Sequence, residues 1–127
     1  MTAYLLVFFG AGAGGALRHG VNVSCARWCG PEFPWGTVSV NVLGSLVMGL
    51  LAGVFAARAG EAFTQQARLL LMTGVLGGFT TFSAYSLDAI SLWERGSGGA
   101  AALYVLGSVV FSILAAAAGL SIARSFS

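Results

Sequence analysis

Long apolar stretches dominate the chain, and short polar segments separate them. Four stretches carry no charged residue, at positions 1–17, 33–57, 69–87 and 96–123. A helix that crosses the hydrocarbon core of a bilayer needs about 20 residues, and the first stretch can reach that length by continuing past Arg18 to about Val23. The pattern therefore predicts an all-α integral membrane protein of one domain, residues 1–127, with transmembrane helices near residues 3–24, 34–57, 68–93 and 99–123.

The composition also points to a lipid bilayer as the surrounding solvent. Charged residues make up 8% of the chain and hydrophobic residues 57%, whereas soluble domains carry about 25% charged residues. So few charges could not cover the surface of a soluble fold. A cleaved signal peptide is disfavoured for the first stretch, because such a segment begins with basic residues and nothing before Arg18 is basic.

The positive charges are all arginine and divide evenly between the ends of the predicted spans. If the spans alternate in direction, three arginines reach each membrane face: Arg18, Arg27 and Arg95 on one, and Arg58, Arg68 and Arg124 on the other. An excess of Lys and Arg on one side normally fixes the orientation of a membrane protein. The even split is either the chance result of a small count or the sign of a protein that inserts both ways up and assembles as an antiparallel dimer.

Two rows of polar residues follow the second and fourth spans at four-residue intervals: Thr37, Asn41 and Ser45, and then Tyr104, Ser108 and Ser112. Residues four apart share one face of a helix. A Ser or Thr in a membrane helix often bonds the carbonyl one turn back, which could explain any single hydroxyl. Asn41 is harder to explain in this way, because its amide has donors and an acceptor that cannot stay unpaired in hydrocarbon. It must face a partner or water.

The third span contains the sequence VLGGFTTFSAYS at positions 75–86. Glycine is a poor helix former, costing about 1 kcal/mol relative to Ala, so Gly77 and Gly78 predict a break near the centre of this helix. A break frees backbone carbonyls, which can coordinate a cation. Phe82 and Tyr85 follow three apart, on one side of the helix as it resumes.

The chain offers no catalytic set. The acids are Glu32, Glu61, Asp88 and Glu94, which we place at span ends or in loops, and His19 has no acid close by in the sequence. We therefore expect no enzyme activity and no carboxylate proton relay. The sequence also lacks the basic patch that nucleic-acid binding would require. Arg18 either extends to the membrane interface or forms a vestibule that attracts anions.

The polar rows suit the passage of a small anion. They provide hydroxyl and amide donors without a buried cation, and conduction requires binding that is favourable but weak enough for release. Aromatic ring edges carry partial positive charge, so Phe82 could offer its edge to an anion. Spacing alone does not identify the anion and is also compatible with a path for water or a weak acid.

Three stretches resemble the Fluc-type (CrcB) fluoride channel family: GGALRH at 14–19, WGTVSVNVLGS at 35–45 and TGVLGGFTTFSAYS at 73–86. They lie on three of the four predicted spans, and the fourth carries the row of Tyr104, Ser108 and Ser112. The combination of GGxTTFS with GTxxxN is specific to this family among four-span proteins.

The resemblance implies an antiparallel, dual-topology homodimer in the bacterial plasma (inner) membrane. It implies two pores that export fluoride passively from the cytoplasm. It further implies a structural sodium ion on the dimer axis, held by the backbone carbonyls of Gly77 and Thr80 from each subunit.

The resemblance also assigns the residues of the fluoride path: Asn41, Thr81, Phe82, Tyr85, Tyr104, Ser108 and Ser112. Arg18 corresponds to an arginine of the family's first span. The Phe side chains are expected to come from a different subunit than most of the polar track. Tyr85 departs from the family, which usually has Phe there. Its hydroxyl could donate to the anion or block the path, and we expect reduced or altered throughput without lost selectivity.

Two other functions fit a small protein with four spans. A dual-topology multidrug exporter would need a membrane-embedded acid for proton coupling, and the first span has none. A non-transporting membrane scaffold would not depend on the polar rows for any flux.

Overall fold

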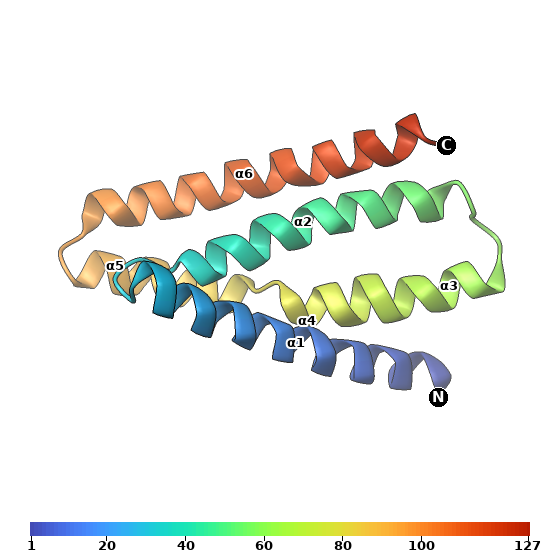
Figure 1. Ribbon diagram of the computed structural model, residues 1–127, viewed down its shortest axis with the longest axis horizontal. Coiled ribbons are helices and arrows are strands. Elements are labelled where there is room, and N and C mark those ends of the chain that lie inside the picture. The colour runs from blue at the N-terminus through green and yellow to red at the C-terminus, as the bar shows by residue number, and fades with distance from the viewer.

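The computed structural model describes residues 1–127, all of whose regular structure is helical. Four helical passes run lengthwise (Figure 1). They are α1 (Thr2–Cys29), α2 (Trp35–Ala56), a composite third pass and α6 (Gly98–Ser125). The third pass consists of α3 (Ala62–Arg68), the π-helix η1 (Leu69–Leu76), α4 (Gly77–Phe79) and α5 (Phe82–Glu94).

The connections alternate between the two ends of the molecule. Both chain termini and the α2–α3 turn lie at one end, while the α1–α2 and α5–α6 turns lie at the other (Figure 1). Gly30, Gly60 and Gly96 stand in these turns with φ of 82°, 101° and 79°, which is backbone that only glycine adopts without strain. Successive passes therefore reverse direction, as a protein that crosses a bilayer repeatedly requires.

Three passes are long and apolar enough to cross a membrane: α2, the third pass from Ala62 to Glu94, and α6. These passes and the shortage of buried side chains identify a multi-pass membrane protein. Only 21 of 127 residues are buried, so most of the apolar side chains face outward, as they do where lipid is the solvent. The first helix is long enough at 28 residues but does not meet the apolarity of a span.

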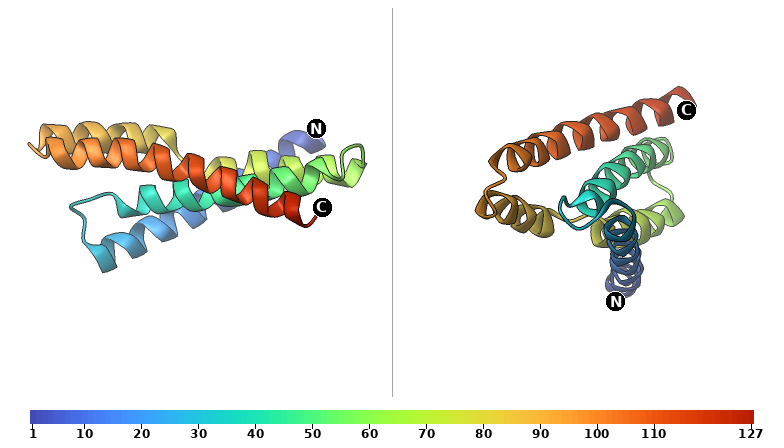
Figure 2. Two further views of the ribbon diagram at one scale, coloured as in Figure 1. Left: turned by 90° about the horizontal axis from the view of Figure 1, so that it is seen from above. Right: turned by 60° about the vertical axis from the view of Figure 1, so that its left-hand side comes forward.

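Glycines allow the passes to approach closely. Along α2 and α6, a side chain at Gly49 would collide with the Ala116 carbonyl, and one at Gly119 would collide with the Leu46 carbonyl. Small residues of this kind are how helices associate in lipid. Figure 2 shows α1 running obliquely to the other passes. At the crossing, Gly14 of α1 lies against the backbone of Val75, so this glycine serves a contact within the chain.

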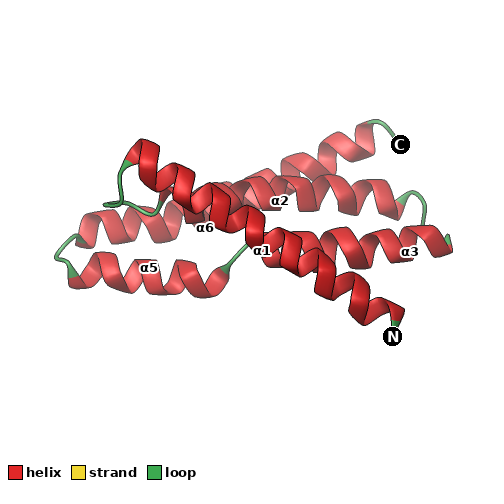
Figure 3. Cartoon of the chain, turned by 60° about the horizontal axis from the view of Figure 1, so that its bottom comes forward, coloured by secondary structure: helices red, strands yellow, loops and turns green.

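The third pass is interrupted, but not at the glycines. Figure 3 shows a short loop between its two helical parts. Gly77 and Gly78 remain in the helix, and the extended residues are Thr80 (φ −84°, ψ 158°) and Thr81 (φ −152°, ψ 122°). The prediction that the Gly pair forms the break is therefore wrong in position. A side chain at Gly78 would collide with the Ala11 carbonyl of α1, so this glycine is needed for helix packing.

Candidate functional site: a polar cavity at the break of the third pass

The threonine hydroxyls of the break bond main-chain groups of the two helical segments on either side of it. The Thr81 hydroxyl accepts a hydrogen bond from the Ala84 amide at 3.1 Å and so caps the start of α5, a role for which Thr is well suited. The Thr80 hydroxyl donates to the Leu76 carbonyl at 2.9 Å. Two neighbouring hydroxyls thus end one helical segment and begin the next.

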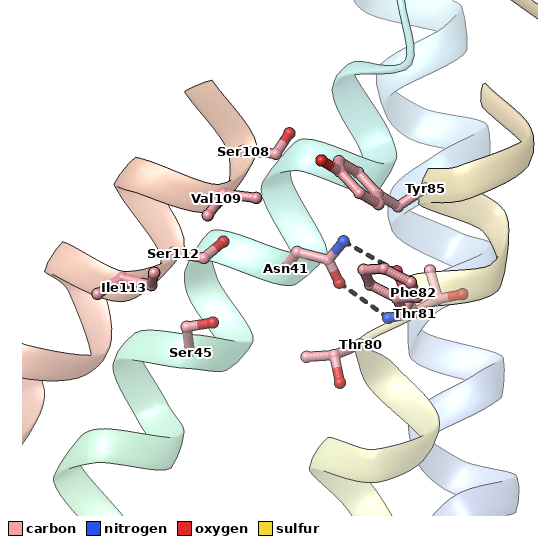
Figure 4. A pocket seen from close by; sticks show the side chains of 10 residues that line it. All are labelled: Asn41, Ser45, Thr80, Thr81, Phe82, Tyr85, Ser108, Val109, Ser112 and Ile113. Atoms are coloured by element: carbon pink, nitrogen blue, oxygen red, sulfur yellow. Dashed lines mark hydrogen bonds between the residues drawn. The ribbon is translucent and has the colours of Figure 1, made fainter. Parts of the chain in front are cut away.

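Asn41 of α2 pairs with the same segment through both ends of its amide. Its Oδ1 accepts a hydrogen bond from the Thr81 amide at 2.8 Å, and its Nδ2 donates to the Thr81 carbonyl at 3.0 Å (Figure 4). This two-point contact gives Asn41 the partner that the sequence required. It also fixes the break against α2, because an amide of a different length or shape could not make both bonds.

A cavity of about 310 Å³ lies beside the break, between α2, α5 and α6. Ten residues line it: Asn41, Ser45, Thr80, Thr81, Phe82, Tyr85, Ser108, Val109, Ser112 and Ile113. Figure 4 shows the hydroxyls of Ser45 and Ser112 directed into the space beside the break. The structure therefore brings together every residue predicted for the anion path except Tyr104.

No charged side chain lines this cavity. Ser108 is only 5% exposed, and its Oγ is buried without a hydrogen-bond partner. A buried hydroxyl nearly always has a partner, and Ser108 does not bond the carbonyl one turn back as isolated membrane serines often do. Its donor is therefore unused within the chain.

The two aromatic residues of α5 differ in exposure. Phe82 lines the cavity and is 78% exposed in a single chain, whereas Tyr85 is 8% exposed. Their ring centroids lie 5.4 Å apart with 41° between the planes. The Tyr85 hydroxyl donates to the Val105 carbonyl of α6 at 2.9 Å. This contact was not foreseen from the sequence, which offered only a donor to the anion or a block.

Tyr104 lies outside the cavity, in a separate polar cluster near one end of the molecule. Its hydroxyl donates to Asp88 Oδ2 at 3.1 Å, and the Thr37 hydroxyl donates to the same oxygen at 2.8 Å. The first members of both polar rows therefore meet at an acid that the sequence analysis set aside. Asp88 is part-buried in α5, near the end of the third pass, so the sequence analysis placed it correctly but did not foresee that it accepts these two hydrogen bonds. Its position three residues after Tyr85 was the available signal, because that spacing keeps it on the same helix face.

Arg18 points toward the break. Its Nη1 lies 3.5 Å from the Thr80 carbonyl, to which it donates a long hydrogen bond. The neighbouring Gly77 carbonyl loses the donors that a continuous helix would give it. The Thr80 amide bonds Leu76 at 3.0 Å, and the Thr81 amide bonds Asn41. The carbonyls of Gly77 and Thr80 thus both lie at the break, outside the regular hydrogen bonding of a helix.

The chain is similar to known proteins over nearly its whole length. Residues 5–120 match the family model described as CrcB-like protein, Camphor Resistance (CrcB). The chain is 58% identical over 126 residues to the fluoride-specific ion channel FluC of Methylobacterium nodulans, covering 99% of each chain. It is 56% identical over 122 residues to that of Rhodopseudomonas palustris (96% and 97% covered). It is also 56% identical over 121 residues to FluC 2 of Nitrobacter hamburgensis (95% and 96% covered).

Proposed function

Since this chain belongs to the CrcB-like family, we propose that it is a fluoride-specific ion channel through which fluoride leaves the cytoplasm passively. The family resemblance in the sequence is confirmed by this membership. The relatives are named as ion channels, so the prediction that the chain is not an enzyme is also confirmed.

The unpartnered buried hydroxyl of Ser108, a residue that lines an uncharged cavity, is the observation that carries the proposal. Fluoride is a small anion that needs hydrogen-bond donors when it loses water. Hydroxyls and the positive edge of Phe82 can replace part of that hydration. No fixed cation in the lining would retain the ion, and conduction depends on such weak binding.

The pore is proposed to be completed by a second, antiparallel copy of the chain. Phe82 is 78% exposed in one subunit although it lies near the middle of the third pass, and an inverted partner would supply the missing wall. Each homodimer would then contain two pores, with the Phe side chains and most of the polar track contributed by different subunits.

We place a structural sodium ion on the axis of this dimer. The available ligands fit the ion, because Gly77 and Thr80 offer neutral carbonyl oxygens at the break. The backbone amides that would bond the Gly77 carbonyl in a continuous helix bond other acceptors there. Bound there, the ion would neutralise carbonyl dipoles from both subunits. Replacing sodium by potassium should lower the thermal stability of the purified dimer; an unchanged melting temperature would count against this site.

We also propose that α1 is the fourth membrane crossing and that the bilayer is the bacterial inner membrane. The helix is 28 residues long and lies against the third pass through Gly10, Gly14 and Gly78. Arg18 is directed at the break and not at lipid, which lowers the cost of carrying this charge across.

Fluoride efflux from reconstituted liposomes, followed with a fluoride electrode, tests the function. The proposal expects fluoride efflux that needs only a potassium path for charge balance, and no comparable chloride efflux. Proton-coupled efflux of cationic drugs would instead identify a multidrug exporter. Vesicles that release neither would support a scaffold and refute the channel.

A further inference from the structure

The hydroxyl of Tyr85 has a role that the proposed fluoride path does not require. It donates to the Val105 main-chain carbonyl at 2.9 Å, in a side chain that is 8% exposed. A phenol has a single proton to donate. While that proton is held by Val105, the hydroxyl cannot donate to an anion in the cavity.

This hydrogen bond joins two helices that have few other polar links. α5 begins directly after the break, and one further hydrogen bond connects it to α6, from the Tyr104 hydroxyl to Asp88 at 3.1 Å. The Tyr85 contact is the nearer of the two to the break. It therefore ties the cavity end of α5 to the helix that carries Ser108 and Ser112.

The bond also sets the direction of the aromatic ring. A tyrosine hydroxyl lies on the long axis of its ring, so an anchored hydroxyl fixes where that axis points. The Tyr85 ring packs between Phe82, at a centroid distance of 5.4 Å, and Tyr104, at 5.2 Å. A change in its direction would shift the Phe82 neighbour that lines the cavity.

We propose that Tyr85 is a positioning residue: its hydroxyl anchors α5 to the α6 backbone, keeps the paired rings in their conducting orientation and stays out of the anion path. This inference rests on the proposed fluoride conduction and adds a specific residue to it. A phenylalanine, which the family usually has at this position, can offer the same ring but not the anchor, so this inference departs from the expectation from the sequence that the Tyr85 hydroxyl reduces throughput.

The variant Tyr85→Phe tests the anchor because it removes one oxygen atom and keeps the ring. Tyr4→Phe is the matched control, since Tyr4 is 79% exposed near the start of α1. Initial fluoride efflux from proteoliposomes is measured over a series of internal fluoride concentrations, together with the fluoride-to-chloride ratio. Sizing chromatography verifies that each variant is folded.

The anchor predicts that the maximal efflux rate of Tyr85→Phe falls about two- to tenfold, as expected for the loss of one net hydrogen bond. The half-saturating fluoride concentration and the ion preference should stay at wild-type values, and Tyr4→Phe should match wild type throughout. A rise in the half-saturating concentration, or a lost preference for fluoride, would make the hydroxyl an anion ligand and overturn the inference.

Two other results would also overturn it. A faster maximal rate would mean that the hydroxyl obstructs the path, and identical behaviour of Tyr85→Phe and wild type would mean that the anchor does nothing. Absence of fluoride efflux from the wild-type protein is a different failure, because it refutes the proposed function itself.

Discussion

At the scale of single residues, the site depends on side chains that either bond the backbone of the break or have no hydrogen-bond partner within the chain. Asn41 is the first kind, with both ends of its amide on the Thr81 peptide. Ser108 is the second, with a buried hydroxyl that bonds nothing in the chain. Substitution of Asn41 should therefore act mainly through the structure of the break, whereas substitution of Ser108 should act through ion binding.

Replacing Asn41 with Asp should reduce fluoride efflux at least tenfold. The carboxylate cannot donate to the Thr81 carbonyl, and leaving a buried partner unsatisfied costs about 1–3 kcal/mol. It also adds a negative charge to the wall of an anion path. Electrode-recorded efflux measures the loss, and Gln66→Glu, the same exchange at an exposed position of α3, should behave as wild type. Normal efflux through Asn41→Asp would remove this residue from the pore.

Replacing Ser108 with Ala should impair transport while leaving the fold intact. Because the hydroxyl has no partner in the chain, its removal breaks no intramolecular bond, and the melting temperature should stay the same or rise. The half-saturating fluoride concentration should increase severalfold, since a donor to the ion is lost. Ser121→Ala, on the exposed surface of α6, controls for the exchange. A clear fall in melting temperature with normal efflux would reverse the assignment.

At the scale of the elements, the break in the third pass shows what a sequence pattern can and cannot specify. The presence of an interruption near Gly77 could be predicted, as could the pairing of Phe82 with Tyr85. Its position could not, because helix propensity treats glycine as a breaker, whereas in lipid a helix keeps its bonds wherever it can. The threonines instead leave the helix, because Asn41, forty residues earlier in the chain, offers a better partner to the Thr81 backbone.

The same limit explains why the pattern grouped residues that the structure places in two separate clusters. Four-residue spacing placed Thr37 with Asn41, and Tyr104 with Ser108, which is correct for the helix face. It could not show that Asp88, from a third helix, would bond both Thr37 and Tyr104 and so separate them from the cavity. A contact across three helices depends on how the helices pack, and no local pattern contains that information.

Packing between α1 and the third pass provides a direct test of the glycine assignment. Gly78→Val would drive a side chain into the Ala11 carbonyl, and overpacking of this kind costs about 1–3 kcal/mol. We expect a lower melting temperature and loss of the folded protein on sizing chromatography. Gly99→Val is the control, because a side chain there would meet nothing within 4 Å. Equal stability of both variants would return Gly78 to the role of a helix breaker.

At the scale of the whole molecule, the alternating passes place nearly equal numbers of arginines at the two ends, while Arg18 lies at the break. The chain termini and the α2–α3 turn share one end (Figure 1). Arg58 follows α2, Arg68 ends α3 and Arg124 lies in the last turn of α6 at this end, whereas Arg27, in the last turn of α1, and Arg95, directly after α5, lie at the other. With a difference of a single arginine between the ends, the rule that fixes orientation from such charges gives little preference for either direction. An even population of both orientations is what an antiparallel homodimer needs.

The thiol of Cys29 can report this orientation directly. It is free and exposed at the end of α1, whereas Cys25 on the same helix is part-buried. In a Cys25→Ser background, a membrane-impermeant maleimide applied to intact spheroplasts should label about half of the protein, because nearly equal arginine counts at the two ends leave about half of the copies with this end outside. Permeabilised cells should show complete labelling.

Adding two arginines beside Arg124, as Ser125→Arg and Ser127→Arg, should shift the labelled fraction toward one extreme and abolish efflux, since copies that all face one way cannot form the inverted pair. A labelled fraction near zero or near complete in the unmodified chain would exclude the dual-topology dimer.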